Sequence, residues 1–340
     1  MIYTEQTLFS KVKYYRKLRE ELIGYLLKYP HDWQKFQEMF NSSVNKIYTD
    51  ILNFEKDNIY KSESKVYKFK KIFETRYKHY FLYGEYIKWS FEKPFGYAGD
   101  FKIIDDIYQN QPCTTGFDRL WDNYFQQLAA PKAVRERKED FKEIILSFIK
   151  DRKNQNIRIM NLGSGPATEI KEMLDNDSEK FLSGVIFDCY DFDIRAIDYA
   201  KKLLNGANNV NFFQKNAVRL ALKKDIKNEI SRDYDLIYST GLFDYLDETI
   251  TVRLLNNLKK ILKEGGVIAI SNVGNKYNNP SAAWMEWVAD WYLVYKTEFE
   301  LKKIFLNAGF SAKNLQITPQ RNKVMLYCIA SKELNLKNPY

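Results

Sequence analysis

A short segment near the middle of the chain carries residues that could hold a small polar ligand. Residues 157–169 read IRIMNLGSGPATE, an apolar run that ends abruptly in a Gly-Ser-Gly turn at 163–165. This order is typical of a buried strand, a tight turn and a helix that begins at the turn. Glycine allows the sharp turn and lets a ligand approach the backbone. Free N–H groups at the helix start then favour an anionic or hydroxyl-rich ligand.

The end of the next expected strand adds a carboxylate to this site. Residues 188–193 read DCYDFD, and Asp191 stands where it can accept hydrogen bonds from both hydroxyls of a ribose. Phe192 could stack on a base, and Asp193 is expected to cap the following helix. A dinucleotide site would also need a third glycine in a Gly-x-Gly-x-x-Gly pattern, but Thr168 occupies that position. The sequence therefore argues against that class.

Two further strand ends complete the expected rim of the site. Asn216 follows the third strand, and its amide could bind the edge of an adenine. The segment STGLFDYL at 239–246 follows the fourth strand. Open α/β sheets bind ligands at the carboxyl ends of their parallel strands, so these segments are expected to lie together.

The elements that position these segments alternate between strands and helices from residue 157 onward. We expect strands at 157–162, 184–191, 210–215, 234–239, 266–272, 312–318 and 323–330, and helices at 167–174, 194–204, 218–230, 249–262, 282–294 and 297–308. Five apolar strands separated by helices predict a doubly wound parallel sheet. The last two strands have a short connection and are expected to pair antiparallel at its edge.

Residues 1–150 show apolar residues at steps of three and four, as amphipathic helices do. We expect at least three helices before residue 92, with breaks at Pro30 and near 57–64, and further helices at 101–108, 117–128 and 131–150. Between them lies KPFGYAGD at 93–100, where two glycines surround Tyr97 and precede Asp100. Both residues could contact a ligand, although Asp100 could also serve only as a helix cap.

Residues 157–330 resemble a class I S-adenosylmethionine-dependent methyltransferase. The features that carry this resemblance are the glycine turn, Asp191, the Lys215-Asn216-Ala217 segment and the loop at 239–246. The resemblance implies an α/β fold with a Rossmann-like seven-stranded sheet, S-adenosylmethionine as cofactor, S-adenosylhomocysteine as product, and no metal. It implies a cofactor site formed by Gly163, Ser164, Gly165, Glu169, Asp191, Phe192, Asn216, Ala217, Ser239, Thr240 and Gly241.

The same resemblance implies two domains. Residues 1–150 would form an N-terminal all-helical cap domain that contributes GYAGD to the active site. Residues 151–340 would form the methyltransferase domain, with a helical insertion at about 278–296. The sequence also resembles the family assigned to biosynthesis of the extracellular factor 3-hydroxypalmitic acid methyl ester. Four segments carry this resemblance: KPFGYAGDFKIIDDIY, AVRERK at 133–138, GLFDYL and WYLVYKT. That family implies O-methylation of a fatty-acid-like carboxylic acid.

The expected chemistry is an in-line displacement that depends on positioning. A carboxylate acceptor, with an ordinary pKa of about 4, is ionised at neutral pH and needs no general base. This suits a chain with two histidines. N- or O-methylation of an amine or hydroxyl, assisted by Asp100 or Tyr245, stays open. A non-catalytic cofactor-binding regulatory module is the alternative of another class.

The acceptor is expected to meet residues that surround the cofactor loop. The catalytic candidates are Tyr97, Asp100, Asp244 and Tyr245. Arg135 could pair with an acceptor carboxylate through two parallel hydrogen bonds, although Arg135 and Arg137 could also lie on a charged helix face. The other pocket candidates are Phe243, Trp287, Trp291 and Tyr295, and the last three belong to an aromatic stripe whose spacing also suits core packing.

Composition limits the partners and the compartment. The net charge of +9 comes mainly from lysines spread along the chain without a dense basic block, so nucleic acid is not expected. Two histidines and three scattered cysteines exclude a histidine-rich metal site and a disulfide framework. The sequence has no signal-peptide pattern and no uncharged apolar run of roughly 18 residues. We therefore expect a cytoplasmic protein that acts on a small molecule or lipid, and a homodimer would be compatible with the sequence.

Overall fold

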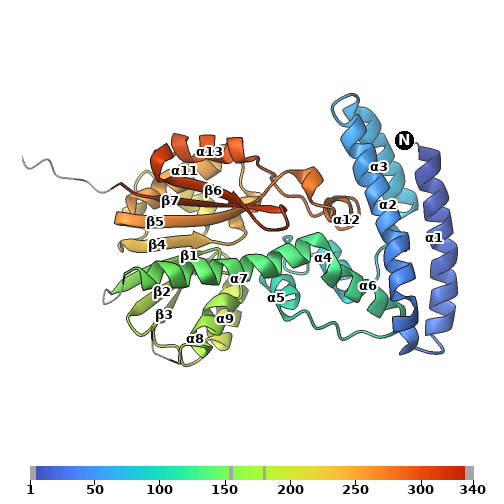
Figure 1. Ribbon diagram of the computed structural model, residues 1–340, viewed down its shortest axis with the longest axis horizontal. Coiled ribbons are helices and arrows are strands. Elements are labelled where there is room, and N and C mark those ends of the chain that lie inside the picture. The colour runs from blue at the N-terminus through green and yellow to red at the C-terminus, as the bar shows by residue number, and fades with distance from the viewer. Residues whose placement is uncertain (1–4, 153–155, 179–180, 334–340) are drawn as a thin grey trace, which may run out of the picture. The chain divides into compact units, whose positions relative to one another are not determined.

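The computed structural model describes residues 5–152, 156–178 and 181–333, and the chain separates into two units (Figure 1). The first unit runs to Val134 and also takes the segment Lys276–Tyr292. The second contains Arg135–Asn275 and the residues from Leu293 onward. The division therefore falls inside helix α7 (Ala129–Lys150), not at residue 150 as expected. Phe141 in the second half of α7 packs its ring against tyrosines of the sheet, which explains the shift.

The first unit is helical, as the amphipathic pattern predicts. Its helices are α1 (Glu5–Leu26), α2 (Gln37–Asn58), α3 (Glu63–Arg76), α4 (Glu85–Glu92), α5 (Phe101–Gln109), α6 (Gly116–Gln127) and, from the inserted segment, α12 (Ala282–Trp287). Aromatic side chains dominate its core, among them Phe40, Phe81 and Trp121. The helix predicted at 282–294 is shorter in the structure, since α12 ends at Trp287, and the left-handed conformation of Asp290 (φ 50°) prevents a right-handed helix from reaching residue 294.

The second unit is built on a seven-stranded sheet, which confirms the α/β fold. Its strands are β1 (Ile157–Leu162), β2 (Val185–Asp191), β3 (Val210–Gln214), β4 (Tyr234–Ser239), β5 (Leu262–Val273), β6 (Leu315–Pro319) and β7 (Met325–Ser331). The spatial order is β3-β2-β1-β4-β5-β7-β6. Strands β1 to β5 are parallel, whereas β7 runs antiparallel to both β5 and β6. The antiparallel terminal pair is therefore confirmed.

Helices follow the strands much as the sequence predicts. They are α8 (Thr168–Asp175), α9 (Ile194–Leu203), α10 (Ala217–Leu222), α11 (Glu248–Lys260) and α13 (Glu298–Asn307). The prediction of a single helix at 218–230 is wrong, because α10 ends at Leu222. Asp225 then accepts the N–H of Lys227 and caps a separate 3₁₀ turn. Among the residues that the structure describes, no helix has the length and apolar character to cross a membrane.

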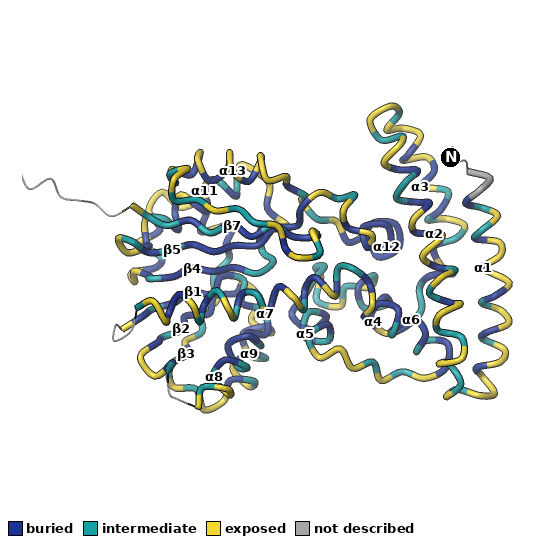
Figure 2. The backbone as a smooth tube through the Cα atoms, viewed as in Figure 1, coloured by how far each residue is buried: buried dark blue, intermediate teal, exposed yellow. Residues whose placement is uncertain are grey.

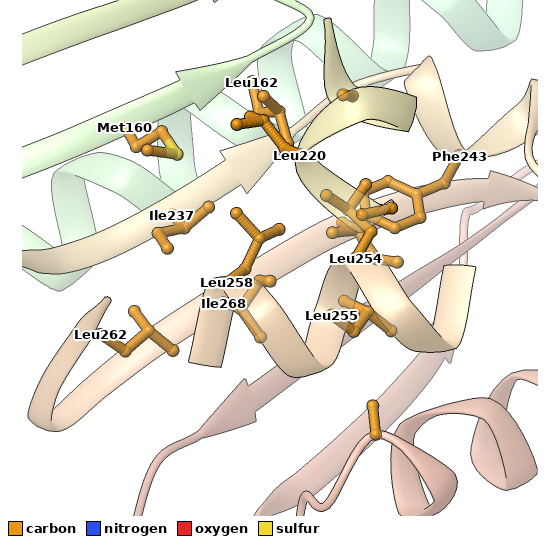
Figure 3. Packing of buried hydrophobic residues seen from close by; sticks show 14 of the residues in the cluster. Met160, Leu162, Leu220, Ile237, Phe243, Leu254, Leu255, Leu258, Leu262 and Ile268 are labelled. Atoms are coloured by element: carbon orange, nitrogen blue, oxygen red, sulfur yellow. The ribbon is translucent and has the colours of Figure 1, made fainter. Parts of the chain in front are cut away.

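Two neighbouring residues of β4 show how the sheet is covered on both faces. Ile237 points into the large apolar cluster beneath α11, which also contains Leu254 and Ile268 (Figure 3). Tyr238 points the other way, toward Phe141 of α7, because successive side chains of a strand alternate. Figure 2 accordingly shows the central strands almost wholly buried. The functional residues must therefore lie at strand ends.

Candidate functional site

The glycine turn after β1 has the backbone geometry that the sequence predicts. Gly163 and Gly165 have φ values of 69° and 51°, in the left-handed region that glycine adopts without strain. The N–H groups of Gly163 and Ser164 both donate to the carbonyl of Tyr190, at 2.8 and 3.0 Å, which ties the turn to β2. A Cβ built on Gly165 would meet no described atom within 4 Å beyond its chain neighbours. The backbone is therefore open at Gly165.

Asp191 lies at the end of β2 and reaches across to that turn. Its Oδ2 accepts the N–H of Gly165 at 2.9 Å, and its Oδ1 accepts the N–H of Asp193 at 2.9 Å. Burial raises the pKa of the Asp191 carboxyl, while these N–H donors act to lower it. Each carboxylate oxygen accepts more than one hydrogen bond, so Asp191 can still receive ligand hydroxyls. The side chain of Asp193 accepts the N–H of Arg195, which confirms the expected cap of α9.

A network of buried polar side chains lies beside the turn and is formed by Asn161, Glu169 and Tyr238. Oε1 of Glu169 accepts hydrogen bonds from Asn161 Nδ2 and from the hydroxyl of Tyr238, both at 2.8 Å. Burial raises the pKa of Glu169. This residue, expected at the cofactor site, is thus held by the protein itself. Asn161 and Tyr238 were not among the predicted site residues, although a polar Asn161 inside an apolar strand is a signal that could have revealed the network. The Ser164 hydroxyl is buried and has no hydrogen-bond partner among the described residues.

The adenine-side candidates follow β2 and β3. Phe192 is 47% exposed, so its ring is accessible. Oδ1 of Asn216 accepts the N–H of Arg219 and caps α10, so contact with an adenine edge would fall to its Nδ2 donor. Ala217 is buried in the first turn of that helix.

The candidates after β4 divide between structural and accessible positions. The hydroxyl of Ser239 donates to the carbonyl of Leu162 at 2.7 Å, which braces β1 against β4. Thr240 is half-buried and Gly241 has φ 138°. Within the 3₁₀ helix η4 (Leu242–Tyr245), Phe243 belongs to the apolar core and not to a pocket wall (Figure 3). Tyr245, by contrast, is 41% exposed.

Asp244 is buried and bonded within the fold. Its Oδ1 accepts the N–H of Val273 at 2.6 Å, and its Oδ2 lies 3.3 Å from Arg137 Nη1. Burial raises the pKa of this carboxyl, and the nearby cations Arg137 and Lys296 oppose that shift. The interpretation of Arg137 as part of a charged helix face is wrong, because it turns inward to Asp244 and is 3% exposed. Arg135 is half-buried, and burial lowers its pKa.

Part of this chain is similar to known proteins. Residues 153–310 match a family described as "Methyltransferase domain". Over these residues the chain is similar to methyltransferases, and we therefore refer to the second unit as the methyltransferase domain. The malonyl-[acyl-carrier protein] O-methyltransferase 1 of Ilyobacter polytropus is 30% identical over 175 residues, which cover 51% of this chain and 55% of that protein. The chain thus spans about half the length of this curated relative.

A solved structure shares its fold with a large part of this chain. It is described as a possible exported protein from Bordetella parapertussis, and it aligns with a TM-score of 0.56 and 19% identity. The alignment covers 69% of this chain and 79% of that one.

Of the remaining site candidates, Tyr97, Asp100, Trp287 and Trp291 belong to the helical unit. Asp100 caps α5, since it accepts the N–H groups of Lys102 and Ile103, and its Oδ2 also accepts Trp89 Nε1–H at 2.9 Å. Tyr97 is half-buried in the preceding turn.

The aromatic stripe is largely core. Trp287 is buried against Phe69 and Phe73, and its Nε1 donates to Glu55 at 2.9 Å. Trp291 packs edge-on against Trp284. These two tryptophans, expected near the acceptor, thus build the interior of the helical unit. Tyr295 is half-buried in the segment that returns to the methyltransferase domain.

Proposed function

We propose that this protein transfers a methyl group from S-adenosylmethionine to a small-molecule or lipidic acceptor, and that this acceptor is a carboxylic acid which becomes a methyl ester. The observation that carries the cofactor assignment is the contact between Asp191 and the N–H of Gly165. It brings a ribose-binding carboxylate and an open glycine backbone to one place.

The residues present fit this cofactor. The space beside Gly165 is clear of described atoms, and the Ser164 hydroxyl is buried without a partner among the described residues. Asp191 would hold the ribose hydroxyls, Phe192 would stack on the adenine, and the turn at 163–165 would hold the amino-acid part. When bound, the cofactor supplies an electrophilic methyl group on a sulfonium.

A carboxylate acceptor suits the groups that the methyltransferase domain offers. Both histidines of the chain, His31 and His79, belong to the helical unit. The buried carboxylates Glu169 and Asp244 are already bonded by protein groups. An acceptor that is ionised at neutral pH removes the need for a strong base, so the protein must only align it and exclude water. The similarity to the Ilyobacter O-methyltransferase also supports methylation of an acceptor oxygen.

We place this activity in the cytoplasm. The three cysteines are free thiols, with Cys113 exposed and Cys189 and Cys328 buried. Unpaired thiols suit a reducing compartment.

Calorimetric titration with S-adenosylhomocysteine tests the cofactor assignment, and the wild-type protein is expected to bind at micromolar concentration. The acceptor is tested with S-adenosylmethionine labelled on its methyl group, incubated with fatty acids and with alcohols and amines of matched length. Methyl esters release methanol in alkali, whereas ethers and methylamines do not. Label released from the fatty-acid reactions supports the proposal. Stable label on an amine or hydroxyl overturns the acceptor assignment, and binding without transfer to any acceptor would identify a regulatory module.

A further inference from the structure

Four buried polar side chains meet where β4 and β5 end, and we call them the Asp244 cluster: Arg137, Asp244, Asn272 and Lys296. Nζ of Lys296 donates to the carbonyl of Phe243 at 3.0 Å and to Asn272 Oδ1 at 2.9 Å. Arg137 Nη1 donates to Asp244 Oδ2 at 3.3 Å. The cluster fixes the segment between β4 and α11, on the side of the sheet edge where the acceptor is expected.

The Asp244 cluster holds more positive than negative charge. Arg137 and Lys296 are 3% and 4% exposed, and Asp244 is the buried carboxylate between them. Other acidic groups near the cluster are engaged or exposed, since Asp140 accepts the Tyr327 hydroxyl and Asp247 is exposed. A buried cation whose hydrogen-bond donors lack partners is energetically costly. The buried charge of Arg137 therefore favours binding of an additional anion.

The Arg137 guanidinium has hydrogen-bond donors to offer to such an anion. Arginine carries five N–H donors in a planar fork that matches a carboxylate. Arg137 donates through Nη1 to Asp244 and, over a longer distance of 3.6 Å, to the sulfur of Met325. Nε of Arg137 is buried and has no hydrogen-bond partner among the described residues.

The guanidinium also lies close to the cofactor turn. A Cβ on Gly163 would lie 3.1 Å from Cβ of Leu242, so η4 borders the turn directly. A Cβ on Gly241, the residue before Leu242, would lie 3.2 Å from Arg137 Nη2. Because Gly241 has no side chain, the guanidinium lies close to its backbone, one residue away from the contact with the turn.

We propose that Arg137 binds a carboxylate in the methyltransferase domain, an inference that rests on the proposed function. Two ligands of that reaction carry the required group, the amino-acid part of the cofactor and the acceptor acid. Both present the same planar anion to the guanidinium fork, and binding experiments can tell them apart.

The test compares ligands that differ only in the carboxylate. In the first arm, wild-type protein and Arg137→Gln are titrated with S-adenosylhomocysteine and with its decarboxylated analogue. In the second arm, the protein saturated with S-adenosylhomocysteine is titrated with dodecanoic acid and with dodecanol. Arg137→Gln is expected to lose about 10- to 100-fold in affinity for the carboxylate ligand of one arm, while the carboxylate-free ligand changes by less than about threefold. The affected arm identifies the source of the carboxylate.

Asp244→Asn is the matched control, because it removes the other half of the Arg137–Asp244 pair. If Arg137 binds the ligand, this variant keeps the preference for the carboxylate ligand. If the pair only holds η4 in place, both variants lose affinity alike, and that result overturns the proposal. Arg137→Lys keeps the positive charge but lacks the planar fork, and it serves as the test variant if Arg137→Gln does not fold. Wild-type affinity of Arg137→Lys for the carboxylate ligands of both arms would also overturn the proposal.

Two results separate this inference from the proposed function. Binding of S-adenosylhomocysteine by wild-type protein, with no preference for the carboxylate ligand in either arm, overturns the role of Arg137 alone. Failure of the wild-type protein to bind S-adenosylhomocysteine overturns the proposed function, and the role of Arg137 with it.

Discussion

The carboxylate of Asp191 accepts the backbone N–H of Gly165, with 2.9 Å between oxygen and nitrogen. The two residues stand at the ends of adjacent parallel strands, since β1 pairs with β2 along its whole length. The carboxylate therefore orients the turn, and the same side chain remains able to accept ligand hydroxyls. Asp191 thus orients the turn of the proposed site and would also contact its ligand.

Asp191→Ala should weaken binding of S-adenosylhomocysteine by about 10- to 100-fold, because hydrogen bonds to a charged group are lost and the turn is released. Calorimetric titration measures the change. Asp193→Ala is the matched control two residues away. It removes the cap of α9 and should cost about 0.5–2 kcal/mol of stability, with little effect on affinity. Equal loss of affinity in both variants would contradict the role given to Asp191.

Gly165→Ala should cost about 1–2 kcal/mol of stability, because an L-residue must take the left-handed conformation at φ 51°. The new methyl group enters the clear space beside the turn, so affinity for S-adenosylhomocysteine should also fall. Gly206→Ala is the control, since Gly206 also has a positive φ, and a Cβ there meets no described atom within 4 Å. Denaturant unfolding and titration should show similar stability losses, with an affinity loss for Gly165→Ala alone.

The sequence was sufficient to predict the strands of the sheet and the helix caps, because both depend on local patterns of residues. Apolar runs bounded by turns predicted β1 and β4 at their observed bounds. The caps at Asp100 and Asp193 follow from their places just before helices.

What the sequence could not reveal depends on residues that are distant in the chain. Arg137 lies among charged neighbours and looks exposed, but its partner Asp244 is 107 positions away. Phe243 and Trp287 have the residue types of a pocket wall, and only the packing shows that they are core. The division inside α7 is likewise invisible in a continuous helical pattern.

Phe243 and Tyr245 are close in sequence and should respond oppositely to truncation. Phe243→Ala removes a fully buried ring from the cluster in Figure 3 and should cost about 3–5 kcal/mol of stability. Tyr245→Ala, at a position 41% exposed, should change stability by no more than about 0.5 kcal/mol. If Tyr245 contacts the acceptor, KM for the acceptor rises in this variant. Thermal unfolding and methyl-transfer kinetics provide the two measurements, and a strongly destabilised Tyr245→Ala would show that its ring is structural.

Lys296 should make stability depend on pH in the alkaline range. Burial lowers the pKa of its ammonium from 10.5 to about 8, although nearby carboxylates such as Asp244 oppose the shift. Between these two values the unfolded chain binds the proton more strongly than the folded protein. The contribution of this group to the free energy of unfolding therefore rises as pH increases from about 8 to about 10.5.

Comparison with Lys296→Met isolates this effect, because the tyrosines and other lysines titrate in both proteins. The free energy of unfolding of wild-type protein minus that of Lys296→Met should stay constant below about pH 8 and increase above it. Urea unfolding at a series of pH values measures this difference directly. A difference that stays constant through pH 10.5 would mean that the ammonium is as well stabilised in the Asp244 cluster as it is in water.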